Sequence, residues 1–469
     1  MSALKRAVNV IPLLVFVAIH PSAGRAQAVT PQQQFARDVY KELLEINTVT
    51  ATGDTGAAAE AMAARLRAGG FPDTDVQVFH SAPRKGDLVA RMHGSGTRKP
   101  ILLMAHIDVV EAKREDWSFD PFHLTVQDGY FYARGSEDDK FMAAALVSDL
   151  IRLKREGYKP DRDLILLLET DEEGGDPNVV GIRWMIKNHP DLINAAYALN
   201  EGGGIGTKNG RAVRNDLQTS EKAVINFTFE TKNRGGHSSL PSKDNAIYRL
   251  AEGLTRLGKF DFPIDLNDTT RAWLERAAPL EDRQTGADMN SVASGHPDPA
   301  AVARLTAMPA YNSQLRTTCV ATLLEGGHAV NALPQMARAT VNCRVLPGEK
   351  FEDIQKTLVQ VVADDQISIA PAHVDVYSQP SPLTPELVQA VEKVTAEFWP
   401  GIPVIPTMST GATDGRFLRN AGIATYGMTG LAMDIDDVRA HGRDERVPIQ
   451  SFDTGLEFLY RLIKTLSTN

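Results

Sequence analysis

Three short, uninterrupted apolar runs constrain the fold of this chain more than any other feature. They span Ile101–Ala105, Leu164–Leu168 and Ala195–Leu199, and each has the length of a single strand. A strand covered by helices on both faces of its sheet is apolar throughout, without alternation. Segments with helical character, such as Lys140–Glu156, separate the runs. The alternation predicts an α/β fold with a mainly parallel sheet and helices on both faces.

The pattern changes near residue 220, where apolar and polar residues begin to alternate. Such alternation is typical of antiparallel strands with one face exposed. Three strands of this kind are expected at Ala223–Thr231, 315–325 and 336–345. We therefore expect a larger α/β domain, built from residues 29–218 and 347–469, that is interrupted by a smaller α+β domain at 219–346.

The N-terminus has the features of an export signal. Lys5 and Arg6 precede a mostly apolar stretch, Val8–Ile19, and Ala26–Ala28 supplies a cleavage pattern of small residues. The stretch is shorter than the roughly 20 residues that a membrane span needs. The sequence predicts a signal peptide at residues 1–28, cleaved after Ala28, and a secreted or periplasmic protein without a membrane span. An uncleaved signal anchor is the alternative.

Charge and cysteine content limit the remaining choices. The formal net charge of −9 disfavours nucleic acid as a partner, because a phosphate binder needs a basic face. The two cysteines, Cys319 and Cys343, do not form a C-x-x-C pair. In an exported protein they could form a disulfide if their strands fold as a hairpin, and two buried thiols are the alternative.

Acidic and imidazole side chains follow each of the three apolar runs. His106 and Asp108 follow the first run, Glu172 and Glu173 the second, and Glu201 the third. Ligands of open α/β sheets bind at the carboxyl ends of the strands, so these side chains are expected on one rim. Each group alone also fits a solvated turn, but three acidic strand ends on one rim would repel one another without a cation.

Two further segments add to this set. Asp138 lies in the acidic run Glu137–Asp139 before a helix, which alone also fits a helix N-terminus that favours negative charge. His441 lies in a polar loop far along the chain. Imidazole and carboxylate donors suit a pair of divalent ions, which can activate a water molecule and polarise a carbonyl. The sequence therefore predicts metal-assisted hydrolysis.

The order of the motifs resembles that of the M20 metallopeptidases (the M20/M25/M40 peptidases). The resemblance covers essentially all of the mature chain and is greatest to the carboxypeptidase S and aminoacylase-like branch. The segments that carry it are MAHIDVV, DGYFYARGSEDDK, ETDEEGG, LNEGGG, RGGHSS, GGHAVNALP, VNCRVLPG, STGATDGRF and HGRDERVP. The resemblance implies a zinc-dependent catalytic domain and an inserted lid or dimerisation domain.

The resemblance also implies roles for the acidic and imidazole side chains. Asp138 would bridge two Zn²⁺ ions, for which Co²⁺ can substitute. His106 and Glu201 would complete one metal site, and Glu173 and His441 would complete the other.

Two further residues would serve the reaction itself. Glu172 would be the general base, and Asp108 would steady His106. The peptide bond between Asp138 and Asp139 would be cis.

Substrate-binding roles follow from the same resemblance. His237 would stabilise the developing oxyanion, and in dimeric relatives this histidine comes from the partner subunit. Asn331 and Arg344 would bind the terminal carboxylate of the substrate, and the backbone at Gly411 would lie close to it. Arg344 alone also fits an ion pair at the end of a strand. The family includes dimers and monomers, so a homodimer through the inserted domain is an expectation of the resemblance only.

The leading prediction is an exopeptidase that hydrolyses short peptides with a free C-terminal carboxylate. The alternative enzyme is an N-acyl-amino-acid hydrolase, because both substrates carry an amide next to a carboxylate. A third hypothesis is a metal-dependent binding protein that has lost catalysis, which is expected to lack an acid at position 172, where this chain has Glu172.

Overall fold

The computed structural model describes residues 28–174, 181–374 and 376–468. The predicted signal peptide lies outside these residues, apart from Ala28. Among the described residues, none of the helices combines the length and the apolar character that crossing a bilayer requires.

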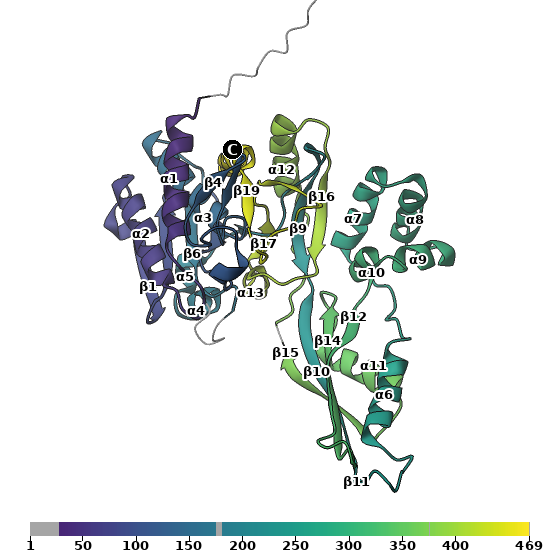
Figure 1. Ribbon diagram of the computed structural model, residues 1–469. Coiled ribbons are helices and arrows are strands. Elements are labelled where there is room, and N and C mark those ends of the chain that lie inside the picture. Colours follow the sequence, from purple (N-terminus) through teal and green to yellow (C-terminus); the bar gives the residue numbers. More distant parts are fainter. Residues whose placement is uncertain (1–27, 175–180, 375, 469) are drawn as a thin grey trace, which may run out of the picture.

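The three apolar runs form neighbouring strands in the middle of a large sheet (Figure 1). They are β3 (Ile101–His106), β6 (Leu164–Glu169) and β7 (Tyr197–Asn200), and β3 pairs in parallel with both of the others. The other described strands of this sheet are β1 (Val76–Ala82), β2 (Lys85–Met92), β8 (Ile205–Lys208), β9 (Arg211–Glu221), β16 (Val404–Ser409), β17 (Ala424–Gly427) and β18 (Ala432–Asp434). Parallel pairs join β6, β3, β7 and β17 at the centre, and β2 and β9 pair with this central group in antiparallel fashion on its two sides. Beyond β9, β16 pairs with β9 and β18 pairs with β8 in parallel.

Helices cover both faces of the large sheet, which explains why its central strands are apolar throughout. Leu103 and Leu166 pack into one apolar cluster with helices on their face, whereas Leu102 and Ile165 pack into a second cluster on the opposite face. The first face carries α1 (Pro31–Glu45), α2 (Thr55–Ala68), α3 (Lys140–Arg155), α12 (Pro385–Phe398) and α14 (Ile449–Leu466), and the second carries α4 (Gly181–Asn188), α5 (Pro190–Ile193) and α13 (Gly415–Asn420). Each fully buried leucine contributes about 1.5–3 kcal/mol. The predicted α/β fold is confirmed.

A second, four-stranded antiparallel sheet lies beside the large one (Figure 1). Its order is β12 (Thr318–Gly326), β14 (Met336–Val345), β10 (Ala223–Lys232) and β15 (Ile367–Val374). Ile225, Phe227 and Phe229 of β10 are buried under α6 (Ala246–Leu257) and α11 (Phe351–Val362), and the residues between them are partly exposed. The alternation that the sequence shows after residue 220 therefore reflects a sheet with helices on one face.

The second sheet continues past the boundary expected at residue 346. Both α11 and β15 follow that position in the chain and share the apolar cluster of β10 and α6. β15 also pairs with β10 from Ile225 to Thr231. We therefore propose that the inserted unit ends near residue 374.

The segment between α6 and β12 forms a helical unit rather than an irregular loop. Its helices are α7 (Asp268–Ala277), α8 (Arg283–Ala293), α9 (Pro299–Thr306) and α10 (Pro309–Leu315). They share an apolar cluster that includes Ile405 of β16, and the guanidinium of Arg276 donates to the carbonyl oxygen of Val404 at 2.9 Å. In the sequence, the helical unit thus lies between elements of the four-stranded sheet, but in space it packs on the large sheet.

Two small sheets complete the fold. β4 (Thr125–Gln127), β5 (Tyr130–Tyr132) and β19 (Arg446–Pro448) form one of them in the order β19-β5-β4. β11 (Gly236–His237) and β13 (Ala332–Leu333) form the other at the far tip of the four-stranded sheet (Figure 1).

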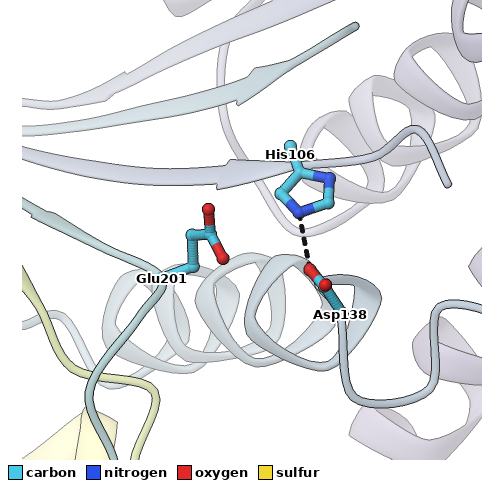
Figure 2. A group of neighbouring side chains, drawn as sticks. All are labelled: His106, Asp138 and Glu201. Carbon is cyan, nitrogen blue, oxygen red and sulfur yellow. Dashed lines mark hydrogen bonds and ion pairs between the residues drawn. The ribbon is translucent and has the colours of Figure 1, made fainter. Parts of the chain in front are cut away.

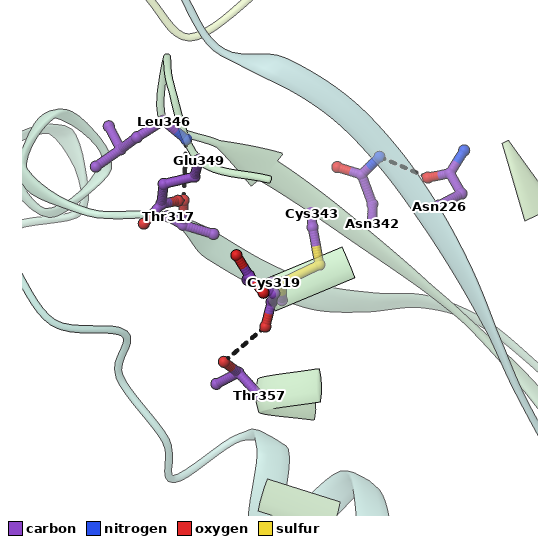
Figure 3. The surroundings of a disulfide bond; sticks show 9 residues. Asn226, Thr317, Cys319, Asn342, Cys343, Leu346, Glu349 and Thr357 are labelled. Carbon is purple, nitrogen blue, oxygen red and sulfur yellow. Dashed lines mark hydrogen bonds between the residues drawn. A yellow bond between two sulfur atoms is a disulfide. The ribbon is translucent and has the colours of Figure 1, made fainter. Parts of the chain in front are cut away.

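A disulfide joins Cys319 of β12 to Cys343 of β14 (Figure 3). The two residues are direct partners in the antiparallel register of these strands, with Cα atoms 4.1 Å apart. The hairpin hypothesis is therefore confirmed, and the alternative of two buried thiols is wrong.

Replacing both cysteines by serine is expected to destabilise the inserted unit. The bond closes a loop with a sequence separation of 24, and loop closure of this size contributes about 3 kcal/mol by restricting the unfolded chain. Denaturant unfolding followed by circular dichroism measures the loss. Reductant should lower the midpoint of the natural chain and leave that of the double variant unchanged, and equal midpoints for the two oxidised proteins would contradict the expectation.

Candidate metal centre

The sheet brings three of the five predicted ligands, together with the predicted base, to one edge. His106 is the last residue of β3, Glu201 directly follows β7, and Glu172 and Glu173 lie in the turn after β6. Because these strands are parallel neighbours, their carboxyl ends meet at the same rim. Side chains that directly follow these strands in the sequence are therefore close to one another in space.

The remaining two ligand candidates come from outside the sheet. Asp138 lies just before α3, and the peptide bond between Asp138 and Asp139 is cis, as the resemblance predicted. His441 lies in the loop before β19 with a φ angle of 61°, a left-handed conformation that few non-glycine residues adopt.

The two oxygens of the Asp138 carboxylate face two different imidazoles. His106 Nε2 lies 2.9 Å from Oδ1, and His441 Nε2 lies 3.1 Å from Oδ2. His441 Nε2 is also 2.9 Å from Glu173 Oε1. Two groups of donors result, His106/Asp138/Glu201 (Figure 2) and Asp138/Glu173/His441, and within each group the donor atoms lie within 4.8 Å of one another.

Several acids crowd around the two imidazoles at this rim and shift one another's pKa values and those of the imidazoles. Burial alone would raise the pKa of Asp138, but hydrogen bonds to His106 and His441 outweigh burial and hold this pKa below its usual value. Hydrogen bonds to Asp138 and Glu173 raise the pKa of His441 to about 10. Burial, together with the charges of Glu172 and Asp138, raises the pKa of Glu201 well above its usual value. Positive charge at this rim is therefore strongly favoured.

Asp108 holds two parts of the rim together. Its Oδ1 accepts a hydrogen bond from the backbone N–H of Glu172 at 3.2 Å, and its Oδ2 accepts one from that of Glu173 at 3.1 Å. His106 Nδ1 lies 3.1 Å from the main-chain oxygen of Asp108 and 3.5 Å from Oδ1. Asp108 is fully buried, so it fixes both the imidazole ring and the turn after β6.

Glu172 lies in the same turn. Burial raises its pKa well above its usual value, and the negative charge of Asp414 is the second largest cause of the increase. Sequence reasoning did not single out Asp414, a buried residue just before α13. The signal that points to it is its place in the segment STGATDGRF, three residues after Gly411. A carboxyl with a raised pKa can both accept and return a proton near neutral pH.

The substrate-binding candidates divide into two separate pairs. His237 and Asn331 lie at the tip of the four-stranded sheet, far from the rim (Figure 1). There, His237 is exposed, and the backbone N–H of Ser238 donates to the Asn331 carbonyl oxygen at 3.0 Å. The structure of one chain therefore does not bring this pair to the candidate metal centre.

Arg344 and Gly411 form the second pair, near the junction of the two sheets. Arg344 Nη1 donates to the carbonyl oxygen of Thr410 at 3.2 Å, and Gly411 is the next residue in the loop after β16. The guanidinium and the exposed backbone of Gly411 are therefore neighbours, although they come from different sheets.

A pocket of about 400 Å³ opens beside the centre. Asp138 and Glu201 line it directly. Apolar side chains and further acids, among them Glu137, Asp216 and Asp434, also line it. Arg214 lines it as well and lies 2.9 Å from Asp216. The pocket can therefore hold a small group attached to whatever the centre binds.

Comparison with known proteins agrees with this geometry. The sequence profile of the peptidase family M20/M25/M40 matches residues 102–465. The human "N-fatty-acyl-amino acid synthase/hydrolase PM20D1" is 29% identical over 385 residues, which are 79% of this chain and 75% of the human protein. The "Probable carboxypeptidase S-like 2" of Dictyostelium discoideum is 28% identical over 381 residues, which are 78% of this chain and 71% of that protein.

Among solved structures, the M20 family metallo-carboxypeptidase Sso-CP2 from Sulfolobus solfataricus has the same fold. It superposes with a TM-score of 0.67 at 17% sequence identity, covering 92% of this chain and 99% of that one. The chain thus belongs to the peptidase family M20/M25/M40, as its motifs predicted, and is a hydrolase of that family.

Proposed function

We propose that the protein is a dinuclear zinc exopeptidase that removes residues from short peptides with a free C-terminal carboxylate. The observation that carries the proposal is the Asp138 carboxylate, whose two oxygens face His106 and His441 separately. A carboxylate placed in this way can be shared by two ions.

The donor set fits two zinc ions. Each site would have one imidazole nitrogen, one oxygen of Asp138 and one further carboxylate, from Glu201 or from Glu173. The buried acids that raise one another's pKa values would be neutralised by two dications. Ions bound here would polarise the scissile carbonyl and make a water molecule easier to deprotonate.

The side chains of this chain supply the proton transfer. Glu172 would take a proton from the attacking water and pass it to the leaving amine, which the raised pKa of this carboxyl favours. Asp108 would keep Glu172 in place through the backbone of the turn and His106 through its ring. Because Glu172 is present, the third hypothesis, an inactive binding protein, has no support.

The charge around the pocket favours a peptide over an acyl amino acid. Asp434, an acid that is not a ligand candidate, lines the pocket beside the centre. A peptide brings a cationic amine to such a site, whereas an N-acyl group brings no charge. At the junction of the sheets, the guanidinium fork of Arg344 suits the terminal carboxylate that both substrates share. The human relative, named as an N-fatty-acyl-amino acid hydrolase, keeps the alternative open.

A homodimer would complete the site. β12 is an edge strand of the four-stranded sheet, and its Val320, Leu323 and Leu324 are 59%, 63% and 69% exposed. An unpaired apolar edge is a template for pairing with a second copy. Pairing of the inserted units would let the tip of one subunit, with His237, reach the centre of the other.

We also propose that the protein is exported, secreted or periplasmic. The Cys319–Cys343 disulfide supports this location, because such bonds persist in oxidising compartments.

Glu172→Gln is expected to retain two zinc ions and to lose about 10²- to 10⁴-fold in kcat, because glutamine cannot accept the proton. Metal content by mass spectrometry and kcat for a cleaved dipeptide test this expectation. Glu60→Gln makes the same chemical change at an exposed position of α2 and should be as active as the natural chain. A Glu172→Gln variant with near-normal kcat would remove Glu172 from the role of base.

A substrate panel separates the peptidase from the acylase. The chain is stripped of metal by a chelator, which should abolish activity, and is then reloaded with zinc or cobalt. We expect hydrolysis of dipeptides and tripeptides, and loss of activity when the C-terminal carboxylate is converted to an amide. Turnover of N-acyl amino acids alone would overturn the peptidase proposal and establish the alternative.

Mixing two inactive variants tests the contribution of His237 from the partner. Glu172→Gln and His237→Ala homodimers are each expected to be nearly inactive. In a mixed dimer, the centre with an intact Glu172 receives an intact His237 from the other subunit, so mixing should restore up to about a quarter of the natural activity. Light scattering checks the oligomeric state, and a monomer, or no recovery from a verified mixed dimer, would contradict the proposal.

A further inference from the structure

One buried ion pair ties the loop of Asp138 to the loop of His441. Arg134 follows β5 and Glu445 precedes β19, and these strands are antiparallel partners. Arg134 Nη1 lies 2.5 Å from Glu445 Oε2, and the two side chains are only 3% and 0% exposed. The backbone N–H of Ala133 also donates to the Glu445 carbonyl oxygen at 3.3 Å, which extends the pairing of the strands.

The acid of this pair holds the loop that carries Asp138. Oε2 of Glu445 accepts the backbone N–H of Gly135 at 3.1 Å, and Oε1 accepts those of Glu137 at 2.7 Å and Asp138 at 3.2 Å. Both oxygens are therefore used as acceptors, and the backbone of Asp138 itself is one of the donors.

The base of the pair holds the loop that carries His441. Arg134 Nη2 donates to the main-chain oxygens of His441 at 3.2 Å and Gly442 at 2.9 Å. Each loop therefore holds the other. Glu445, from the loop of His441, accepts hydrogen bonds from the backbone of the Asp138 loop. Arg134, from the loop of Asp138, donates hydrogen bonds to the backbone of the His441 loop. Each ligand candidate lies four residues from the member of the pair on its own loop.

The two candidate metal sites depend on this tie to different degrees. Two of the three donors of the first site, His106 and Glu201, are attached to β3 and β7, whose pairing in the large sheet fixes them. The third, Asp138, is also held by the start of α3, so this site keeps most of its support without the ion pair. His441 instead lies in a loop, its side chain is 55% exposed, and its backbone has a positive φ. The loop has a further anchor at Asp444, which accepts hydrogen bonds from Ser118. The contacts to Arg134, however, act on the His441 backbone itself.

We propose that Arg134 and Glu445 are positioning residues that set the separation between Asp138 and His441, and so control the occupancy of the Asp138/Glu173/His441 site. The inference rests on the dinuclear centre proposed above. It assigns to this pair the selective support of one of the two sites, and not a general stabilising role.

Glu445→Gln tests the assignment while keeping the shape of the side chain. In glutamine an amide nitrogen replaces one of the two carboxylate oxygens. This nitrogen cannot accept a hydrogen bond, so the N–H groups that donate to that oxygen would lose their acceptor. Calorimetric zinc titration of the metal-free chain is expected to show about 10- to 100-fold weaker binding at one site. The affinity of the other site should change less than threefold.

Two backgrounds identify the affected site. In a His441→Ala chain only the His106 site remains, and adding Glu445→Gln should leave its zinc affinity within threefold. In a His106→Ala chain only the His441 site remains, and adding Glu445→Gln should weaken its zinc binding by the full factor of about 10 to 100. Equal losses in both backgrounds would overturn the proposal, because they would indicate general destabilisation.

Asp163→Asn is the matched control. Asp163 accepts hydrogen bonds from Arg91 at 3.0 Å and from the backbone N–H of Gly94 at 2.9 Å, so it also combines an arginine partner with a backbone donor. It lies just before β6, at the opposite edge of the large sheet from His106. This variant should bind two zinc ions with unchanged affinities.

Arg134→Lys provides a second route if Glu445→Gln does not fold. A lysine keeps the charge beside Glu445 but lacks the fork that reaches the carbonyl oxygens of His441 and Gly442, so the same site should weaken. If a folded variant of either kind binds two zinc ions with natural affinities, the positioning role is wrong. If the natural chain itself binds fewer than two zinc ions, the proposed function is wrong instead.

Discussion

The position of the Asp138 carboxylate is the constraint on which the candidate centre depends. One of its oxygens faces an imidazole at the end of a central strand, and the other faces an imidazole in a distant loop. Both groups of donors therefore include this single side chain, so its backbone has to be held in place. The surrounding structure matches that requirement, because the backbone of Asp138 is fixed by the start of α3 on one side and by Glu445 on the other.

The rim concentrates acids that oppose folding unless they are compensated. Burial raises the pKa values of Glu172, Glu201 and Asp139, so these carboxyls resist ionisation in the absence of cations. The apolar core beneath them supplies the stability to hold them together, since the strands that carry them are buried on both faces. Bound cations would turn this repulsion into binding energy, so stability and metal affinity are linked.

Much of the fold and of the centre could be predicted because the signals are local. The runs at β3, β6 and β7 are apolar throughout, so their burial on both faces follows from the sequence alone. Parallel strands bring their carboxyl ends together, so His106 and Glu201 follow from strand order. The cis bond before Asp139 and the roles of Asp138 and His441 could be expected only from the resemblance, since a histidine in a polar loop is ordinarily just solvated.

The features that the sequence did not reveal are contacts between segments with no shared pattern. Arg134 and Glu445 are 311 residues apart, and a charged residue beside a strand is usually exposed, so their burial as a pair has no local sign. The helical unit after α6 likewise packs on β16 through Ile405, a contact that its own periodicity does not encode. His237 lies in a motif that predicts catalysis, yet the fold carries it to the tip of the second sheet. The homodimer proposed above would give that placement a chemical role, because the histidine of one subunit would serve the centre of the other.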